Sequence, residues 1–256
     1  MNKKDVADHM SDFLKENGFK RKGNRFFKLE ECCLIIIIFE PYSSIRPGFF
    51  VYPLYFPFPF AGLFFGSHLC YYKDRSFRDL DRESTEAEFE DWISKLKNIL
   101  SNDIFLHLEE INSFSKLSKF LDKGYSFVKR YWSVTVKDYY VLRSYTDFIM
   151  ERKDDMKNDI DMGIYWINKW GLYDNIATEW KNKLEILNEK FDRPPNEKKI
   201  FIDGIVENTL FECLGKNWKS LTGNSSIFTV DFSDYKETSV FKRCFKWLIK
   251  KPKTRY

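Results

Sequence analysis

The stretch from Pro47 to Tyr72 carries no lysine, arginine, aspartate or glutamate, so the rest of the chain has to cover it. An uncharged run of about 20 residues can cross a bilayer as a helix. Prolines and glycines recur along this run, however, and each would break backbone hydrogen bonds that a helix needs in lipid. The stretch therefore predicts a covered strand rather than a membrane span.

The aromatic residues of this stretch alternate along the chain, which places them on one face of a strand. They are Phe50, Tyr52, Phe56, Phe58 and Phe60, with Leu54 in the same series. The prolines at positions 53, 57 and 59 have the opposite parity, so the missing N–H groups lie along one lateral side. We therefore predict an edge strand whose aromatic face lies under helices.

The residues before this strand predict a helix and an antiparallel meander. Apolar residues recur at helical spacing over 5–16, and Gly23-Asn24 predicts the turn of a hairpin over 19–29. The run CCLIIIIF at 32–39 is apolar throughout, which is typical of a central strand covered on both faces.

The rest of the chain predicts mainly helices, and the fold class is therefore α+β: an N-terminal helix and a small antiparallel sheet with covering helices, then a mostly helical C-terminal half. We expect an α+β domain over 1–124, a helical region over 125–222, and a strand followed by a basic amphipathic helix over 223–256. Segment 125–136 fits either a strand or an irregular connection. Helices are expected at 84–100, 103–121, 138–150, 154–170, 176–191 and 196–214.

Composition excludes several classes of protein. The 42 basic and 38 acidic residues give a net charge of +4, which is too mild to indicate nucleic-acid binding by itself. The 5 cysteines are odd in number and have no C-x-x-C spacing, so they predict neither a disulfide framework nor a zinc site. Together with an N-terminus that lacks a signal-peptide pattern, this predicts a cytoplasmic protein.

We expect no catalytic residue, metal site or cofactor. Phosphate-binding glycine motifs are absent, and the three histidines stand apart from one another. A nucleophile pair of His68 and Cys70 lacks the orienting third group, so buried structural roles are favoured. Glu151, Asp155 and Asp159 recur every four residues among basic residues, which favours a solvated, ion-paired helix face over a metal site.

Two basic segments are candidate contact surfaces. In the hairpin, Lys20, Arg21, Lys22 and Arg25 alternate with phenylalanines. This pattern fits a phosphate backbone with stacked bases, although alternation of charged and core-facing residues in a strand pair explains it more simply.

The C-terminal segment 236–251 has a basic, amphipathic pattern, which fits an anionic membrane surface or a groove on a partner. Docking on its own chain is favoured, because the apolar side is wide enough to bury. Its candidate contact residues are Phe241, Lys242, Arg243, Phe245 and Lys246.

A resemblance to a known family rests on the first half of the chain. The order of helix, NGFKRKGNRFF, apolar strand and Gly-Phe-Phe-Val-Tyr strand resembles the bacterial family known as domain of unknown function 4304, over roughly residues 4–124. Its most specific part is the spacing G-F-x-R-x-G-x-x-F, which starts at Gly18 and ends at Phe26. The resemblance implies no catalytic residues, and it implies an association with bacterial toxin and immunity genes.

Three hypotheses for function follow. The leading one is a non-enzymatic bacterial protein-binding module, an immunity or defence component that recognises a protein partner. The first alternative is a nucleic-acid-associated protein that uses the hairpin 20–28 and the C-terminal helix. The second alternative is an enzyme whose site comes together from distant segments, which a sequence alone does not reveal.

Overall fold

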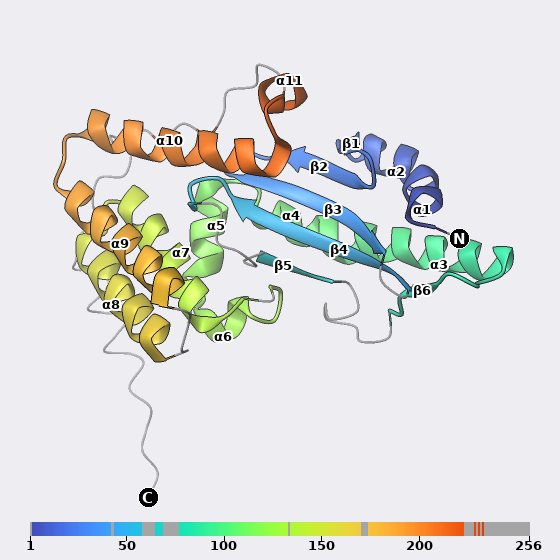
Figure 1. Cartoon of the computed structure of the whole chain (residues 1–256), viewed down its shortest axis with the longest axis horizontal. Coiled ribbons are helices and arrows are strands. Elements are labelled where there is room, and N and C mark those ends of the chain that lie inside the picture. The colour runs from blue at the N-terminus through green and yellow to red at the C-terminus, as the bar shows by residue number, and fades with distance from the viewer. Residues whose placement is uncertain are drawn as a thin grey trace, which may run out of the picture.

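The structure is a computed structural model, and it describes residues 2–41, 44–57, 65–68, 77–132, 134–169 and 174–222 with Phe228, Val230 and Phe232. An antiparallel sheet near the N-terminus is followed by helices (Figure 1), which confirms the α+β class and the mostly helical C-terminal half. No helix among these residues is long and apolar enough to span a membrane.

The sheet has its strands in the order β1-β2-β3-β4-β5, and β6 pairs with β4 beside β5. All pairs are antiparallel. The strands are β1 (Lys20–Lys22), β2 (Arg25–Leu29), β3 (Cys33–Pro41), β4 (Ser44–Pro53), β5 (Phe65–His68) and β6 (Leu80–Asp81).

The hairpin and the central strand are confirmed. Lys22 pairs with Arg25 across the turn, where Gly23 has φ +65, a conformation that glycine adopts without strain. The apolar run forms β3, which has β2 on one side and β4 on the other.

The prediction of an edge strand was wrong, because β4 has neighbours on both sides. It pairs with β3 along its length, with β6 at Ser44 and Ile45, and with β5 from Gly48 to Val51. The ladder ends at Pro53, so Pro57 lies beyond the strand, and Pro59 lies outside the described residues. A proline after the end of a ladder removes no ladder hydrogen bond, and the parity argument therefore did not apply.

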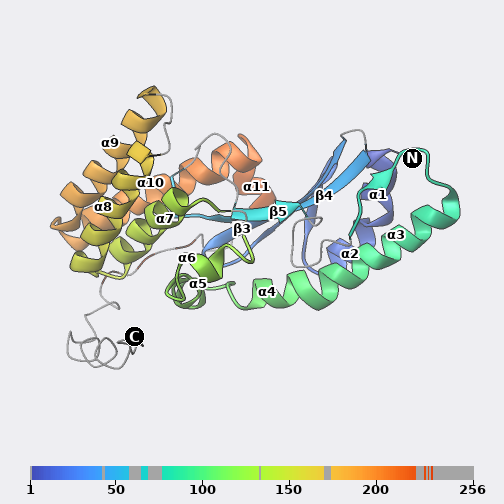
Figure 2. The ribbon, with the colours of Figure 1, turned by 90° about the horizontal axis from the view of Figure 1, so that it is seen from below.

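The two faces of the sheet are covered by different helices. On one face Phe26, Ile37 and Phe49 lie side by side across three strands, and the Phe49 ring is 6.5 Å from that of His107 in α4 (Phe105–Glu109). On the other face Phe27, Ile36 and Phe50 form the matching row. Figure 2 shows α3 (Glu86–Ile99) and α4 along the first face and α10 (Pro195–Leu214) beyond the second.

The better-buried face of β4 is not the predicted one. Phe49 and Val51 are fully buried, whereas Phe50 is half-buried, and of the predicted aromatic face Tyr52 and Phe56 are buried. The alternation identified two faces correctly, but both are apolar, so it did not show which one α3 and α4 cover.

The N-terminal helix is divided at Met10 into α1 (Lys3–His9) and α2 (Ser11–Glu16). The next helix, α3, begins with a capping box in which Thr85 and Glu88 bond each other's backbone N–H groups. It continues without a break through a wide π-helical turn, Leu100–Ile104, into α4. The predicted separation of helices 84–100 and 103–121 is therefore absent. The predicted helix 103–121 is instead interrupted at 110–113, and α5 (Phe114–Leu121) is its second part.

The C-terminal half contains the predicted helices as α7 (Val136–Ile149), α8 (Lys153–Lys169), α9 (Asp174–Phe191) and α10, with short helices α6 (Tyr125–Val128) and α11 (Trp218–Thr222). Segment 125–136 is thus helical and turn-like where it is described. Helices α7 to α9 pack together, and an added Cβ on Gly163 of α8 would lie 3.4 Å from Leu184 and 3.5 Å from Val141. These are ordinary contact distances, so the three helices meet at this position.

One buried apolar cluster joins both halves of the described chain. Phe228 packs against Tyr55 and Phe114, with ring centroids 5.9 and 5.7 Å apart, and Phe232 lies 5.9 Å from Phe148. Of the predicted strand at 223–234 the structure describes Phe228, Val230 and Phe232, and the rest of it lies outside the described residues with the whole predicted C-terminal helix.

Candidate functional site

The basic hairpin is held against the ends of two helices. The Lys22 ammonium donates a hydrogen bond of 2.9 Å to the carbonyl oxygen of Leu214, the last residue of α10. Lys20 donates one of 2.6 Å to the carbonyl of Leu221 in α11. Helix carboxyl ends have unpaired carbonyls and a partial negative charge, so both lysines have a structural role.

Arg21 lies on the opposite side of the strand and is also paired. Its Nη2 is 2.6 Å from an oxygen of Asp8 in α1, and its Nε donates to the carbonyl of Gly23 at 2.8 Å. Its guanidinium also lies 5.6 Å from the centre of the Phe26 ring. These contacts favour a role in holding the hairpin to the N-terminal helices.

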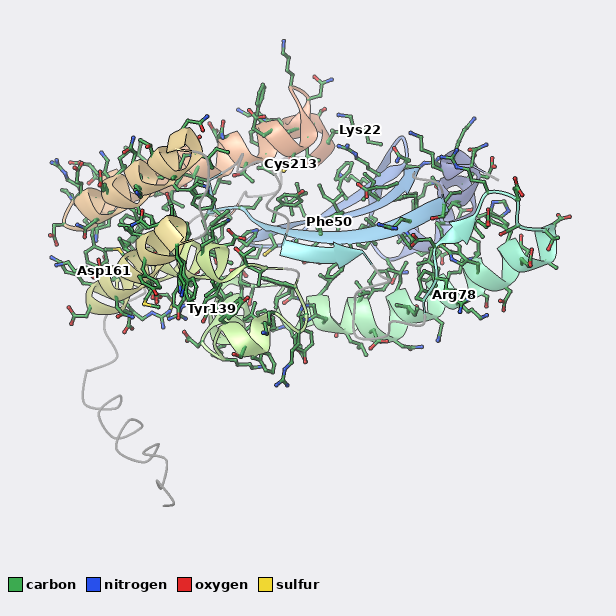
Figure 3. All side chains as sticks on the ribbon, turned by 60° about the horizontal axis from the view of Figure 1, so that its bottom comes forward. Lys22, Phe50, Arg78, Tyr139, Asp161 and Cys213 are labelled. Atoms are coloured by element: carbon green, nitrogen blue, oxygen red, sulfur yellow. The ribbon has the colours of Figure 1, made fainter. Side chains whose placement is uncertain are left out.

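Arg25 differs from its three neighbours because its side chain is exposed and forms no ion pair or hydrogen bond within the described part of the chain. It lines a cavity of about 280 Å³ between β2, β3 and the end of α10. Figure 3 places Lys22 and Cys213 together at this end of α10, beside the sheet that carries Phe50. The lining residues are Lys22, Asn24, Arg25, Phe27, Ile36, Cys213 and Leu214.

The thiol in this cavity is protonated at neutral pH. Burial and the charge of Glu212 raise the pKa of Cys213 to about 12, although the charge of Arg25 opposes them. Burial also raises the pKa of the nearby Tyr52 hydroxyl. A nucleophilic cysteine needs a depressed pKa, so the cavity has the chemistry of a binding site rather than that of a nucleophile.

A second cavity of about 280 Å³ lies between α2, β2 and α4. Its lining includes Lys28 and Glu30, which pair with each other at 2.8 Å. The two charges neutralise each other, and this cavity therefore presents no unpaired cation of the kind that Arg25 provides.

A network of paired charges lies outside both of these cavities. Arg143 of α7 contacts Asp147 at 3.3 Å and Asp159 of α8 at 3.2 Å, and it also bonds Asp122. Arg152 lies 2.5 Å from Asp147, whose side chain is completely buried. Burial raises the pKa of Asp147. The charges of Arg143 and Arg152 lower this pKa, and a hydrogen bond with Asp159 raises it further. The network connects α5, α7 and α8, which indicates a structural role.

The carboxylates of Glu151, Asp155 and Asp159 do not form one solvated helix face. Asp159 is buried against Arg143, so the prediction of a solvated carboxylate was wrong for this residue. Glu151 precedes α8, has φ 54 and pairs with Lys198 at 2.9 Å. Both residues are ion-paired, but with Lys198 and Arg143 of other helices rather than with the basic residues interleaved among them, and Glu151 is partly exposed whereas Asp159 is buried.

The described residues contain no group of three or more His, Cys, Asp and Glu side chains arranged to hold a metal ion. His9 faces Glu90 at 3.6 Å, and the buried His107 accepts a hydrogen bond of 3.1 Å from the Trp132 indole. Cys70 and the side chain of His68 lie outside the described residues, so their pairing stays a hypothesis.

The structure brings Lys22 and Arg25 to one cavity, places Lys20 beside it and directs Arg21 elsewhere. Sequence analysis did not identify Cys213 or Asn24 as neighbours of this site. One sequence signal was available: α10 has no basic residue in its last turn and carries Glu212 there, so a cation from another segment was needed. The C-terminal candidates Phe241, Lys242, Arg243, Phe245 and Lys246 lie outside the described residues.

No family model, curated protein or solved structure matches this chain. The resemblance to domain of unknown function 4304 stays a prediction.

Proposed function

We propose that this chain is a non-enzymatic bacterial binding module that recognises an acidic segment of a protein partner, as an immunity or defence component does. The observation that supports the proposal is Arg25, an exposed cation at the rim of a cavity with an apolar floor. Arginine is enriched where proteins bind one another, because its planar guanidinium pairs bidentately with carboxylates.

Other exposed arginines lack this setting. Arg78, Arg130 and Arg193 also have no ion pair within the described residues, but none of them lines either of the two cavities. Arg78 lies at the far end of the sheet from Cys213 (Figure 3) and serves as a matched control.

The same observations give less support to the nucleic-acid alternative. Binding to a phosphate backbone uses several lysines and arginines that face solvent together. Lys20, Lys22 and Arg21 are engaged within the chain, which leaves Arg25 as the unpaired cation of the hairpin in the described structure.

The test uses purified products of the genes beside this one. Each is titrated into the wild-type chain, Arg25→Ala and Arg78→Ala by calorimetry. We expect one protein to bind the wild type and Arg78→Ala equally, and to bind Arg25→Ala at least about tenfold more weakly, the loss of one charged hydrogen bond. Equal binding by Arg25→Ala would place recognition elsewhere, and failure of every neighbour to bind would overturn the proposed function.

A further inference from the structure

The cavity beside Arg25 is small and has two chemically distinct sides. Its floor consists of Phe27 and Ile36, which are cross-strand neighbours, and Leu214 closes it from α10. Its polar side is lined by Arg25 and Lys22. A ligand that fits both sides has an anionic group and an apolar group close together.

We propose that the cavity binds the carboxyl-terminal residue of the partner chain and that this residue has an apolar side chain. The inference rests on the proposed function and names the part of the partner that is recognised. A terminal residue carries a carboxylate and a side chain on the same carbon atom, so one residue matches both sides of a cavity of about 280 Å³. An internal segment would have to supply the anionic group and the apolar group from two different residues.

The donors available to a carboxylate are sufficient. Arg25 presents its full set of N–H groups, because it forms no hydrogen bond within the described residues, and two of them can meet both oxygens of a carboxylate. Lys22 uses one donor for Leu214 and has three in all. Terminal carboxylates are commonly recognised by such converging donors.

The remaining groups are compatible with this ligand. The Cys213 thiol is neutral and adds apolar surface, and the Asn24 amide is fixed by a hydrogen bond of 2.8 Å to the carbonyl of Phe39. Two acids lie near the cavity: Glu212, whose side chain is exposed next to Cys213, and Glu40, whose charge acts on Tyr52 as that of Arg25 does. Neither acid lines the cavity, whereas both cations do.

The experiment uses acetylated tetrapeptides Gly-Ser-Gly-X, in which X is Leu, Ile, Phe or Trp, titrated by calorimetry into the folded full chain. Each is compared with its carboxyl-terminal amide and with a peptide that ends in Lys. We expect at least one free-acid peptide to bind with a dissociation constant below about 1 mM, and amidation to weaken it at least about tenfold. The affinity of Arg25→Gln for the free-acid peptide should be lower by the same factor. Arg25→Lys should retain part of the wild-type affinity, and Arg78→Gln should bind the peptide as tightly as the wild type does.

Each contrary result has a defined meaning. Equal affinity for acid and amide, equal affinity of Arg25→Gln, or no binding by any peptide would overturn the inference. A free small acid such as 3-phenylpropanoate that binds as tightly as the Phe peptide would also overturn it, because the ligand would then be a small molecule. If a partner binds through Arg25 while all peptides fail, the proposed function stands without the inference. If peptides bind and every neighbouring gene product fails, the proposed function is overturned, and what remains is a preference of the cavity for a carboxyl-terminal residue.

Discussion

The Lys22 ammonium bonds the carbonyl oxygen of Leu214 across 192 positions of the chain. It joins the first hairpin to the end of the longest helix among those that the structure describes. The sequence of this basic hairpin resembles a nucleic-acid-binding surface. The contact gives it a structural role instead, because it connects the hairpin to α10.

Replacing Lys22 with Met should therefore reduce stability while retaining the aliphatic side chain. The charged hydrogen bond and the interaction with the helix end together lead us to expect a loss of about 1–3 kcal/mol in the free energy of unfolding. Urea denaturation measures it. Lys216→Met is the control, because Lys216 is exposed near the same helix end and has no contact of this kind in the described structure. Equal losses of unfolding free energy in both variants would contradict a stabilising role for the hydrogen bond between Lys22 and Leu214.

Asp147 should make stability fall as the pH rises. Its pKa is raised to about 8 by burial in the folded state, against about 3.9 when unfolded, so the folded state holds the extra proton between these values. The resulting contribution is complete below about pH 4 and is lost as the pH approaches 8. Asp147→Asn removes this titration. The free energy of unfolding of the wild type, relative to that of the variant, should therefore be higher at pH 5 than at pH 8.

Thermal or urea denaturation of Asp147→Asn at several pH values tests this dependence, with Asp161→Asn as the control. Asp161 lies exposed on α8 (Figure 3) and shows no pairing in the described structure. A difference between wild type and Asp147→Asn that stays constant from pH 5 to pH 8 would contradict the raised pKa.

The two glycines Gly48 and Gly204 should respond to alanine with opposite signs. A Cβ at Gly48 in β4 would lie 2.8 Å from the Phe50 ring and 3.3 Å from Ile38, so we expect a loss of about 1–2 kcal/mol from crowding. A Cβ at Gly204 in α10 meets nothing within 4 Å, and alanine there should add about 0.5–1 kcal/mol through helix propensity. Denaturation midpoints measure both, and a shared sign would show that packing at Gly48 adjusts freely.

The three cysteines that the structure describes should be poorly reactive in the folded chain. Cys32 and Cys33 are buried with their sulfur atoms 3.6 Å apart, and burial raises the pKa of Cys213 to about 12. At pH 8 we expect iodoacetamide to modify Cys213 at least about 100-fold more slowly than free glutathione, because the thiolate is scarce. Cys32 and Cys33 should react only after urea unfolding. Mass spectrometry of Cys70→Ser/Cys244→Ser protein follows each site, and rapid modification of folded Cys213 would contradict its raised pKa.

Local signals in the sequence were sufficient for the hairpin, the central strand β3 and most helices. A glycine at a turn and a periodic apolar pattern are signals that come from residues close together in the chain, so the sequence alone shows them. The position of β4 depended on strands that follow it, because β5 and β6 occupy its second side. Pro47 fits within β4 because it lies between the residues paired with β6 and those paired with β5.

The candidate site was predicted only in part. The residue types at Lys22 and Arg25 indicated a contact surface, but nothing local to the hairpin distinguished a lysine bonded to a distant carbonyl from an arginine left unpaired. That difference depends on where α10 ends, which is a tertiary contact. Asp159 illustrates the same point, since its burial depends on Arg143 of the preceding helix.

The wide turn between α3 and α4 sets the rotation of one helix relative to the other. It accommodates an additional residue within a continuous helix. A regular α-helix over the same residues would turn everything after it by about 100°. The exposed Leu106 would then point in the direction that His107 has now, and the contacts of His107 with Phe49 and Trp132 would be lost. Chains related to this one should therefore either keep the wide turn or lose it together with one residue of this segment.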